Sequence, residues 1–201
     1  MPKSKFPKSV KFVDIEDLKQ YRFSFIKNDI LKENIAMNMQ FIIFLVTLDE
    51  EYELPGSLRY LTFKTIILYT ASIIESLINY KLSELISDGK INSSKTMDMV
   101  EKYHDSKELY KISNTESVIG VIKSIKPSKL ESNTDFIKLN RASKRCGLFD
   151  EKLFNKAEKL RDMRNKIHLS ALNCVDDKYS KDEINEVFKI AKDLIERIEK
   201  Y

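Results

Sequence analysis

The chain has 201 residues, of which 33% are charged and 42% are hydrophobic, and its formal net charge at pH 7 is +4. A chain of this length is expected to form one domain around one core. Only 4 Gly and 4 Pro are present, too few for the many turns of an all-β or βαβ protein, so the composition favours helices. The lack of clustered glycines also excludes a P-loop and a dinucleotide-binding fingerprint.

Charge and cysteine content narrow the class of protein further. The 35 Lys and Arg residues are interspersed with 31 Asp and Glu residues, so charge alone does not indicate a nucleic-acid partner. Cys146 and Cys174 are the only cysteines, which predicts neither a disulfide framework nor a zinc site and favours a reducing, cytoplasmic location. No apolar run of signal-peptide length occurs in the first 30 residues. We also expect no membrane span, because the apolar run at 41–46 is far shorter than the roughly 20 residues required.

The N-terminal half is dominated by helical spacing. Residues 1–13 hold two prolines and four lysines without periodicity and are expected to form a basic arm. Apolar residues then recur at intervals of three and four, which predicts a helix over 14–48 with a bend. The Pro-Gly pair at 55–56 ends this pattern. Ser57 is the expected N-cap of a second long helix over 57–87, which is ended by Asp-Gly and predicted to be the most buried segment.

The middle of the chain is less regular. Residues 93–130 mix helical spacing with Ser, Asn and Pro, so we expect short helices and loops there. The VIGVI run at 118–122 has the β-branched composition of a strand, but the sequence shows no obvious partner strand for it. Helical periodicity returns at 135–146 and again at 150–172.

The last predicted helix begins at a capping box formed by Ser180 and Glu183. Several long amphipathic helices joined by short connections predict an all-α protein, an up-and-down bundle of three to five long helices, with residues 14–201 as a single domain. A bundle without further features would be expected to act as a scaffold or an interaction module.

One segment carries residues suited to chemistry. The sequence LRDMRNKIHLSAL at 160–172 contains Arg161, Arg164, Asn165 and His168. On a helix, Arg161 and His168 would lie about 20° apart, with Asn165 about 40° to the other side of Arg161. Apolar residues fill the adjoining arc, so this polar row is expected beside the core, where a groove or a subunit interface forms.

These residue types suit phosphodiester chemistry. Arginine offers permanent hydrogen-bond donors for phosphate oxygens, and the ordinary pKa of histidine, about 6.5, allows proton transfer near neutral pH. RNA supplies its own nucleophile in the 2′-OH, so a His with an Arg could cleave RNA without a metal or another cofactor. No Asp, Glu, His or Cys cluster with metal-ligand spacing is evident in the sequence.

The segment GLFDEKLFNKAEKLRDMRNKIHL at 147–169 resembles the HEPN superfamily of all-helical domains, whose signature is an Arg, often followed by Asn, with a His one or two turns later. The apolar helix TASIIESLINYKL at 70–82, with its embedded Glu75, is also similar. In the family, four to six residues usually separate Arg and His. Arg161 is followed by six residues before His168 and fits this spacing, whereas Arg164 is followed by only three but fits the Arg-Asn pairing. The resemblance therefore leaves the identity of the catalytic Arg open.

The resemblance implies a homodimer whose Arg and His residues form a composite, metal-independent endoribonuclease site. Arg161 or Arg164 would then bind the scissile phosphate, His168 would transfer the proton, and Asn165 would position both groups. The family also suggests a toxin or antiviral-defence setting, with an antitoxin or other protein as a partner. The alternative is a catalytically silent HEPN-like module that binds RNA or protein. For Glu75, an ion pair with Arg161 or Arg164 is expected before any catalytic role, because a buried acid requires a partner.

Overall fold

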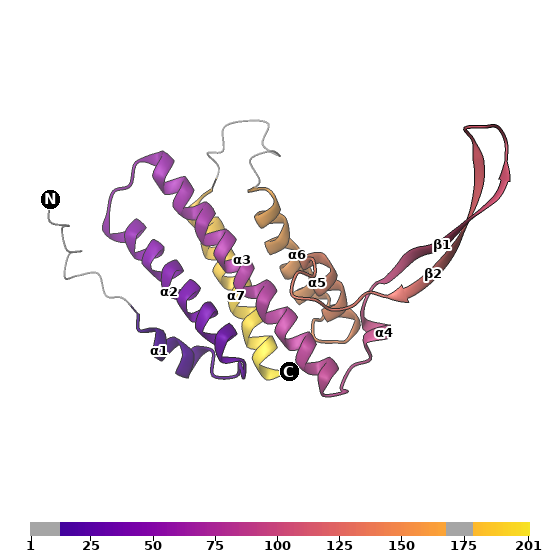
Figure 1. Ribbon diagram of the computed structural model, residues 1–201. Helices are drawn as coiled ribbons and strands as arrows, with labels where there is room; N and C mark the ends of the chain where they lie inside the picture. Colours follow the sequence, from indigo (N-terminus) through magenta and orange to yellow (C-terminus); the bar gives the residue numbers. More distant parts are fainter. Residues whose placement is uncertain (1–12, 168–178) are drawn as a thin grey trace.

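Helices dominate the computed structural model, which describes residues 13–167 and 179–201 (Figure 1). The prediction of a mostly helical protein is therefore confirmed. The elements in chain order are α1 (Ile15–Asp17), a π-helical turn η1 (Leu18–Arg22), α2 (Asp29–Glu51), α3 (Gly56–Ser87), α4 (Ser93–Thr96), β1 (Met99–Lys111), β2 (Ser117–Pro127), α5 (Phe136–Arg145), α6 (Glu151–Asn165) and α7 (Lys181–Lys200).

The predicted N-terminal helix is interrupted rather than bent. Phe23 and Ile26, between η1 and α2, are fully buried and connect this turn to the core. Asn28 then caps α2, because its side-chain oxygen accepts a hydrogen bond from the backbone N–H of Leu31 at 2.9 Å. Burial of two large side chains outside a helix and a strong N-cap together explain why the helix restarts at Asp29.

Helix α3 is the centre of the bundle and packs against α2, α5, α6 and α7. It contains more buried residues than any other described element, which confirms the prediction for 57–87. The helix begins one residue before the predicted cap, so Ser57 lies within its first turn. At the other end Gly89 adopts a φ of +69°, the left-handed conformation that favours glycine after a helix.

Two of the described helices, α2 and α3, are long and apolar enough to cross a bilayer by length and composition. Most of the apolar window of α3 is buried inside the bundle, as is typical of the core helix of a water-soluble domain, whereas most of that of α2 is not. The absence of a membrane span thus stays a prediction.

The segment 93–130, predicted as short helices and loops, contains one short helix, α4, but most of it forms a long antiparallel β-hairpin instead. The strand proposed for 118–122 exists within β2, and its partner is β1, which is rich in Lys, Glu and Tyr. The described part of the chain is thus mostly helical with a small two-stranded sheet, and a purely all-α bundle is not confirmed. Figure 1 shows the hairpin projecting away from the helices. At its base the N–H of Ser128 donates to the carbonyl of Asp98 at 2.8 Å.

The C-terminal half completes the bundle with α5, α6 and α7. Helix α6 ends at Asn165, earlier than the predicted residue 172, and the backbone N–H of Ile167 bonds back to the carbonyl of Arg164 at 3.2 Å. The predicted capping box at the start of α7 is confirmed: the N–H of Glu183 donates to the Ser180 hydroxyl, and the Glu183 carboxylate accepts from the Ser180 N–H.

Candidate functional site

A polar pocket of about 600 Å³ lies between α3, α6 and the loop that leads into α5. Its lining is mostly polar and comes from three segments that are far apart in the sequence. The residues are Ser72, Glu75, Ser76 and Asn79 of α3, residues 132–137 of the loop and the start of α5, and Arg161, Arg164 and Asn165 of α6. Three of the four residues predicted from the 160–172 segment therefore share one cavity with Glu75.

The lining of this pocket contains an ion pair between α6 and α3. Nη1 of Arg164 lies 2.9 Å from Oε2 of Glu75, and both side chains are mostly buried, with 31% and 22% of their surface exposed. This confirms that Glu75 forms an ion pair, as predicted. Of the two candidate arginines, its partner is Arg164 and not Arg161. Half-buried charges are more strongly coupled than charges at an open surface, because water screens them less.

Arg161 is held by a different set of partners. Its Nε donates to Glu158 at 3.1 Å and its Nη2 donates to Asp162 at 2.7 Å. Glu158 in turn accepts a hydrogen bond of 2.6 Å from the side-chain amide of Asn140, which is fully buried on α5. The guanidinium of Arg161 thus lines the pocket in an orientation supported by α5 through Glu158.

The loop that closes the pocket is anchored to α3. The side-chain amide of Asn79 donates to the carbonyl of Glu131 at 2.7 Å. The N–H of Glu131 donates to the hydroxyl of Thr134 at 2.8 Å, which tightens the turn. Asp135 follows at the N-cap of α5, where its side chain makes no capping hydrogen bond. Residues 135–137 line the pocket, so the partial positive charge of this helix N-terminus lies at the pocket together with the Asp135 carboxylate.

The electrostatics of the pocket combine two guanidinium groups with two carboxylates. Burial raises the pKa of Glu75 above its ordinary value, while the neighbouring Arg164 lowers that pKa in part and the charge of Asp135 raises it. Burial is the largest of these effects. The carboxylate of Glu75 is thus easier to protonate than that of an exposed glutamate.

Arg161, Arg164 and Asn165 lie beside the core, as their helical spacing predicted. Ala157 and Leu160 of α6 are fully buried, and Ile167 is 8% exposed, so the arc next to Arg161 and Arg164 does pack into the core. His168, the predicted proton-transfer residue, lies outside the described residues.

Other pocket residues had no functional role in the sequence interpretation. Ser72, Ser76 and Asn79 lie at helical spacing with Glu75, so a polar stripe along an otherwise apolar helix was the available signal. The composition of the loop at 132–135 predicts a turn and indicates no functional role. Within the described ranges, no three His, Cys, Asp or Glu side chains lie together as a metal ion would require.

No family model matches the chain, and comparisons with curated proteins and with solved structures likewise gave no match.

Proposed function

We propose that the pocket is part of the active site of a HEPN-like helical domain that cleaves RNA without a metal ion. The observation that carries this proposal is the convergence of Arg161, Arg164 and Asn165 with Glu75 in one polar cavity. Two guanidinium groups and a helix N-terminus around one cavity are suited to an anionic substrate.

In the proposed reaction the substrate 2′-OH attacks the adjacent phosphorus. The proton of the 2′-OH passes to a general base, the bond from phosphorus to the 2′ oxygen forms, and the bond to the 5′ oxygen breaks as that oxygen receives a proton. The products are a 2′,3′-cyclic phosphate and a 5′-OH. His168 is the candidate for proton transfer, and an arginine would stabilise the negative charge that develops on the phosphate oxygens.

The ion pairs suggest different roles for the two arginines. Arg164 is bound to Glu75, so a phosphate that binds its guanidinium has to share it with the carboxylate or replace the carboxylate. The raised pKa of Glu75 lowers the free-energy cost of phosphate binding to Arg164. Protonation of Glu75 removes the negative charge that competes with the phosphate. Arg161 is fixed by Glu158 and Asp162, and a planar guanidinium keeps further donors for a ligand.

The test uses purified protein and a single-stranded RNA in the presence of EDTA. We expect cleavage of RNA, no cleavage of DNA with the same sequence, and products that end in a cyclic phosphate. His168→Ala should reduce the rate by about 10² to 10⁴, the usual contribution of a proton-transfer group. Arg141→Ala is the matched control, because Arg141 lies on α5 outside the pocket and its guanidinium is 3.8 Å from Asp98.

Mixing two inactive variants tests whether the site is composite. If Arg and His come from different subunits, an Arg164→Ala protein mixed with a His168→Ala protein regains cleavage in the heterodimer. An inert wild type on varied RNAs, or a His168→Ala variant as fast as the wild type, would remove the nuclease proposal.

A catalytically silent module that binds RNA or protein is the second candidate, and one observation favours it. Both guanidinium groups already have carboxylate partners, Glu75 for Arg164, and Glu158 and Asp162 for Arg161. Such a module would bind RNA without cleaving it, and its affinity would not depend on His168. Binding measured in parallel with cleavage separates the two functions.

A further inference from the structure

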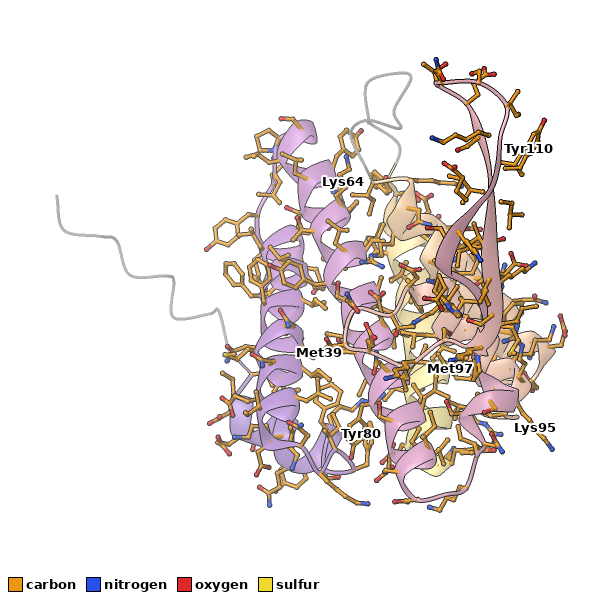
Figure 2. All side chains as sticks on the ribbon, turned by 45° about the vertical axis from the view of Figure 1, so that its right-hand side comes forward. Met39, Lys64, Tyr80, Lys95, Met97 and Tyr110 are labelled. Carbon is orange, nitrogen blue, oxygen red and sulfur yellow. The ribbon has the colours of Figure 1, made fainter. Side chains whose placement is uncertain are left out.

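The β-hairpin formed by β1 and β2 exposes many large apolar side chains. Tyr103, Leu109, Tyr110, Ile119 and Ile125 each have more than half of their surface exposed. No residue from 99 to 127 is buried, and beyond its own strands the hairpin packs mainly against α4, next to its base. Figure 2 shows side chains projecting along the whole ribbon, with Tyr110 far from Met97 at the base.

An isolated two-stranded ribbon is at best marginally stable in water, and exposed apolar clusters of this kind usually mark an interaction surface. The strands are also long, at 13 and 11 residues. These properties predict that another molecule covers the hairpin.

The register of the hairpin defines two different faces, because paired residues lie on the same face and successive residues alternate. Glu101 pairs with Ile125, Tyr103 with Lys123, Glu108 with Ile119, and Lys111 with Ser117. Val121 lies on this same face, opposite the bulge between His104 and Lys107. We call this surface the mixed-charge face.

The opposite surface has another character. Lys102 pairs with Ser124, His104 with Ile122, Lys107 with Gly120, and Val100 with Lys126. It carries three lysines and no carboxylate among these pairs. We call it the lysine face.

The composition of the hairpin favours a protein partner over a nucleic acid. Residues 99–127 contain five Lys, four Asp or Glu and no Arg. The exposed apolar residues are largely Ile, Leu and Val, and among them only Tyr103 and Tyr110 offer a flat ring on which a base could stack. A nearly neutral, aliphatic ribbon fits a protein surface, and on the mixed-charge face Glu101 already contacts Lys123 and accepts a hydrogen bond from Tyr103 at 2.7 Å.

We propose that the mixed-charge face packs against the same face of a second copy of this chain. The two ribbons would stack as antiparallel layers, related by a two-fold axis that runs across the strands at Val121. The rotation exchanges positions at equal distance from Val121 along the ribbon. It places Glu101 opposite Lys111 of the second copy, and Lys111 opposite Glu101.

The remaining contacts of this arrangement are also compatible. Tyr103 comes opposite Glu108 of the second copy, Lys123 comes opposite Ile119 and next to Glu108, and the two Val121 side chains meet at the axis. The two Glu and two Lys of the face therefore balance, and stacked sheets about 10 Å apart leave room for these side chains. A two-fold interface requires such self-complementarity.

The size of the face sets the expected affinity. It contains about half of the hairpin, which is fewer than the roughly 20–30 residues on each side of a standard interface. We therefore expect a dimer that forms at micromolar concentrations. No described hairpin residue lines the pocket, so this inference is independent of the proposed nuclease function, and each can fail alone.

Neighbouring lysine substitutions on opposite faces test the proposal. Sedimentation velocity of the full chain at 1–100 μM should show a dimer for the wild type. Val121→Lys places two like charges at the two-fold axis and should weaken dimerisation at least about tenfold. Ile122→Lys is the matched control, because it adds the same charge to the same strand on the lysine face, and it should leave the dimer unchanged. Circular dichroism checks that both variants remain folded.

A charge exchange tests the pairing of Glu101 with Lys111. Glu101→Lys and Lys111→Glu should each dissociate more readily than the wild type, because each homodimer places like charges opposite one another. An equimolar mixture should form a heterodimer in which both pairs are again of opposite charge. Recovery of dimerisation in the mixture is the result expected from the proposed register.

Three results would overturn the proposal. The first is a wild type that stays monomeric up to 100 μM. The second is a dimer that Val121→Lys and Ile122→Lys weaken equally or not at all. The third is a monomer that binds single-stranded RNA or vesicles of phosphatidylcholine and phosphatidylserine through the hairpin, with Lys102→Glu on the lysine face abolishing that binding and Val121→Lys preserving it.

Discussion

Nη1 of Arg164 and Oε2 of Glu75 lie 2.9 Å apart and join α6 to the central helix α3. This ion pair lines the candidate pocket and is also part of the contact between the two helices. Changes to either residue are therefore expected to affect stability as well as any activity, and the two effects have to be measured separately.

A double-mutant cycle measures the strength of this pair. We expect Arg164→Ala and Glu75→Ala to show a coupling energy of about 1 kcal/mol, because both side chains are partly exposed and water reduces the attraction. Urea unfolding of the wild type, the two single variants and the double variant gives this value. The control cycle is Lys200 with Glu196, which are more exposed and 3.9 Å apart and should show almost no coupling. Equal coupling in both cycles would contradict the special position of Arg164.

The pH dependence of stability tests the environment of Glu75. Its pKa is higher in the folded protein than in the unfolded chain, mainly because of burial. Glu75 therefore contributes most to stability at pH values below its unfolded pKa, and this contribution is lost as the pH rises through the folded pKa. Glu75→Gln lacks this titration. The free energy of unfolding of the wild type minus that of the variant should thus decrease as the pH rises above the ordinary pKa of glutamate, about 4.3.

Urea unfolding at several pH values measures this difference. A difference that instead grows with pH would mean that attraction to Arg164 outweighs the cost of burying the charge. Asp162→Asn is a suitable control, since Asp162 lies on the same helix as Arg164 and its side chain is 56% exposed.

Two serines at helix starts should respond differently to replacement by alanine. Ser180 caps α7 within a complete capping box, so Ser180→Ala should cost about 1 kcal/mol of unfolding free energy. Ser57 lies inside the first turn of α3, after Pro55 at the N-cap. Ser57→Ala should therefore change stability by less than about 0.5 kcal/mol. Chemical denaturation of both variants checks this contrast, and a large loss for Ser57→Ala would mean that Ser57 is the N-cap and that the helix begins two residues later, at Leu58.

Removal of the hairpin should leave the helical bundle folded. Asp98 and Ser128 are joined by a backbone hydrogen bond of 2.8 Å, so a short Asn-Gly link can replace residues 99–127. Because no residue of that segment is buried, we expect a cooperative thermal transition within a few degrees of the wild-type monomer. The same protein should remain monomeric where the wild type dimerises. Loss of cooperative unfolding would show that the hairpin stabilises the bundle itself.

The helical elements and the polar row follow from local features of the chain. The intervals between apolar residues predicted α3, α5 and α7, and the capping box at Ser180 fixed the start of α7 because capping involves residues only three positions apart. The spacing of Arg161, Arg164 and Asn165 similarly predicted one row beside the core. These features depend on neighbours along the chain, so sequence alone is sufficient to find them.

The tertiary structure decided the features that depend on distant partners. Strand β1 was missed because its charged and polar residues show no strand periodicity, and only pairing with β2 identifies it. The choice of Arg164 over Arg161 as the partner of Glu75 depended on how α6 crosses α3. The loop at 132–135 joined the pocket only because Asn79 holds it against α3. Helical periodicity indicates which residues share a face of one helix, but the packing of the helices determines what that face meets.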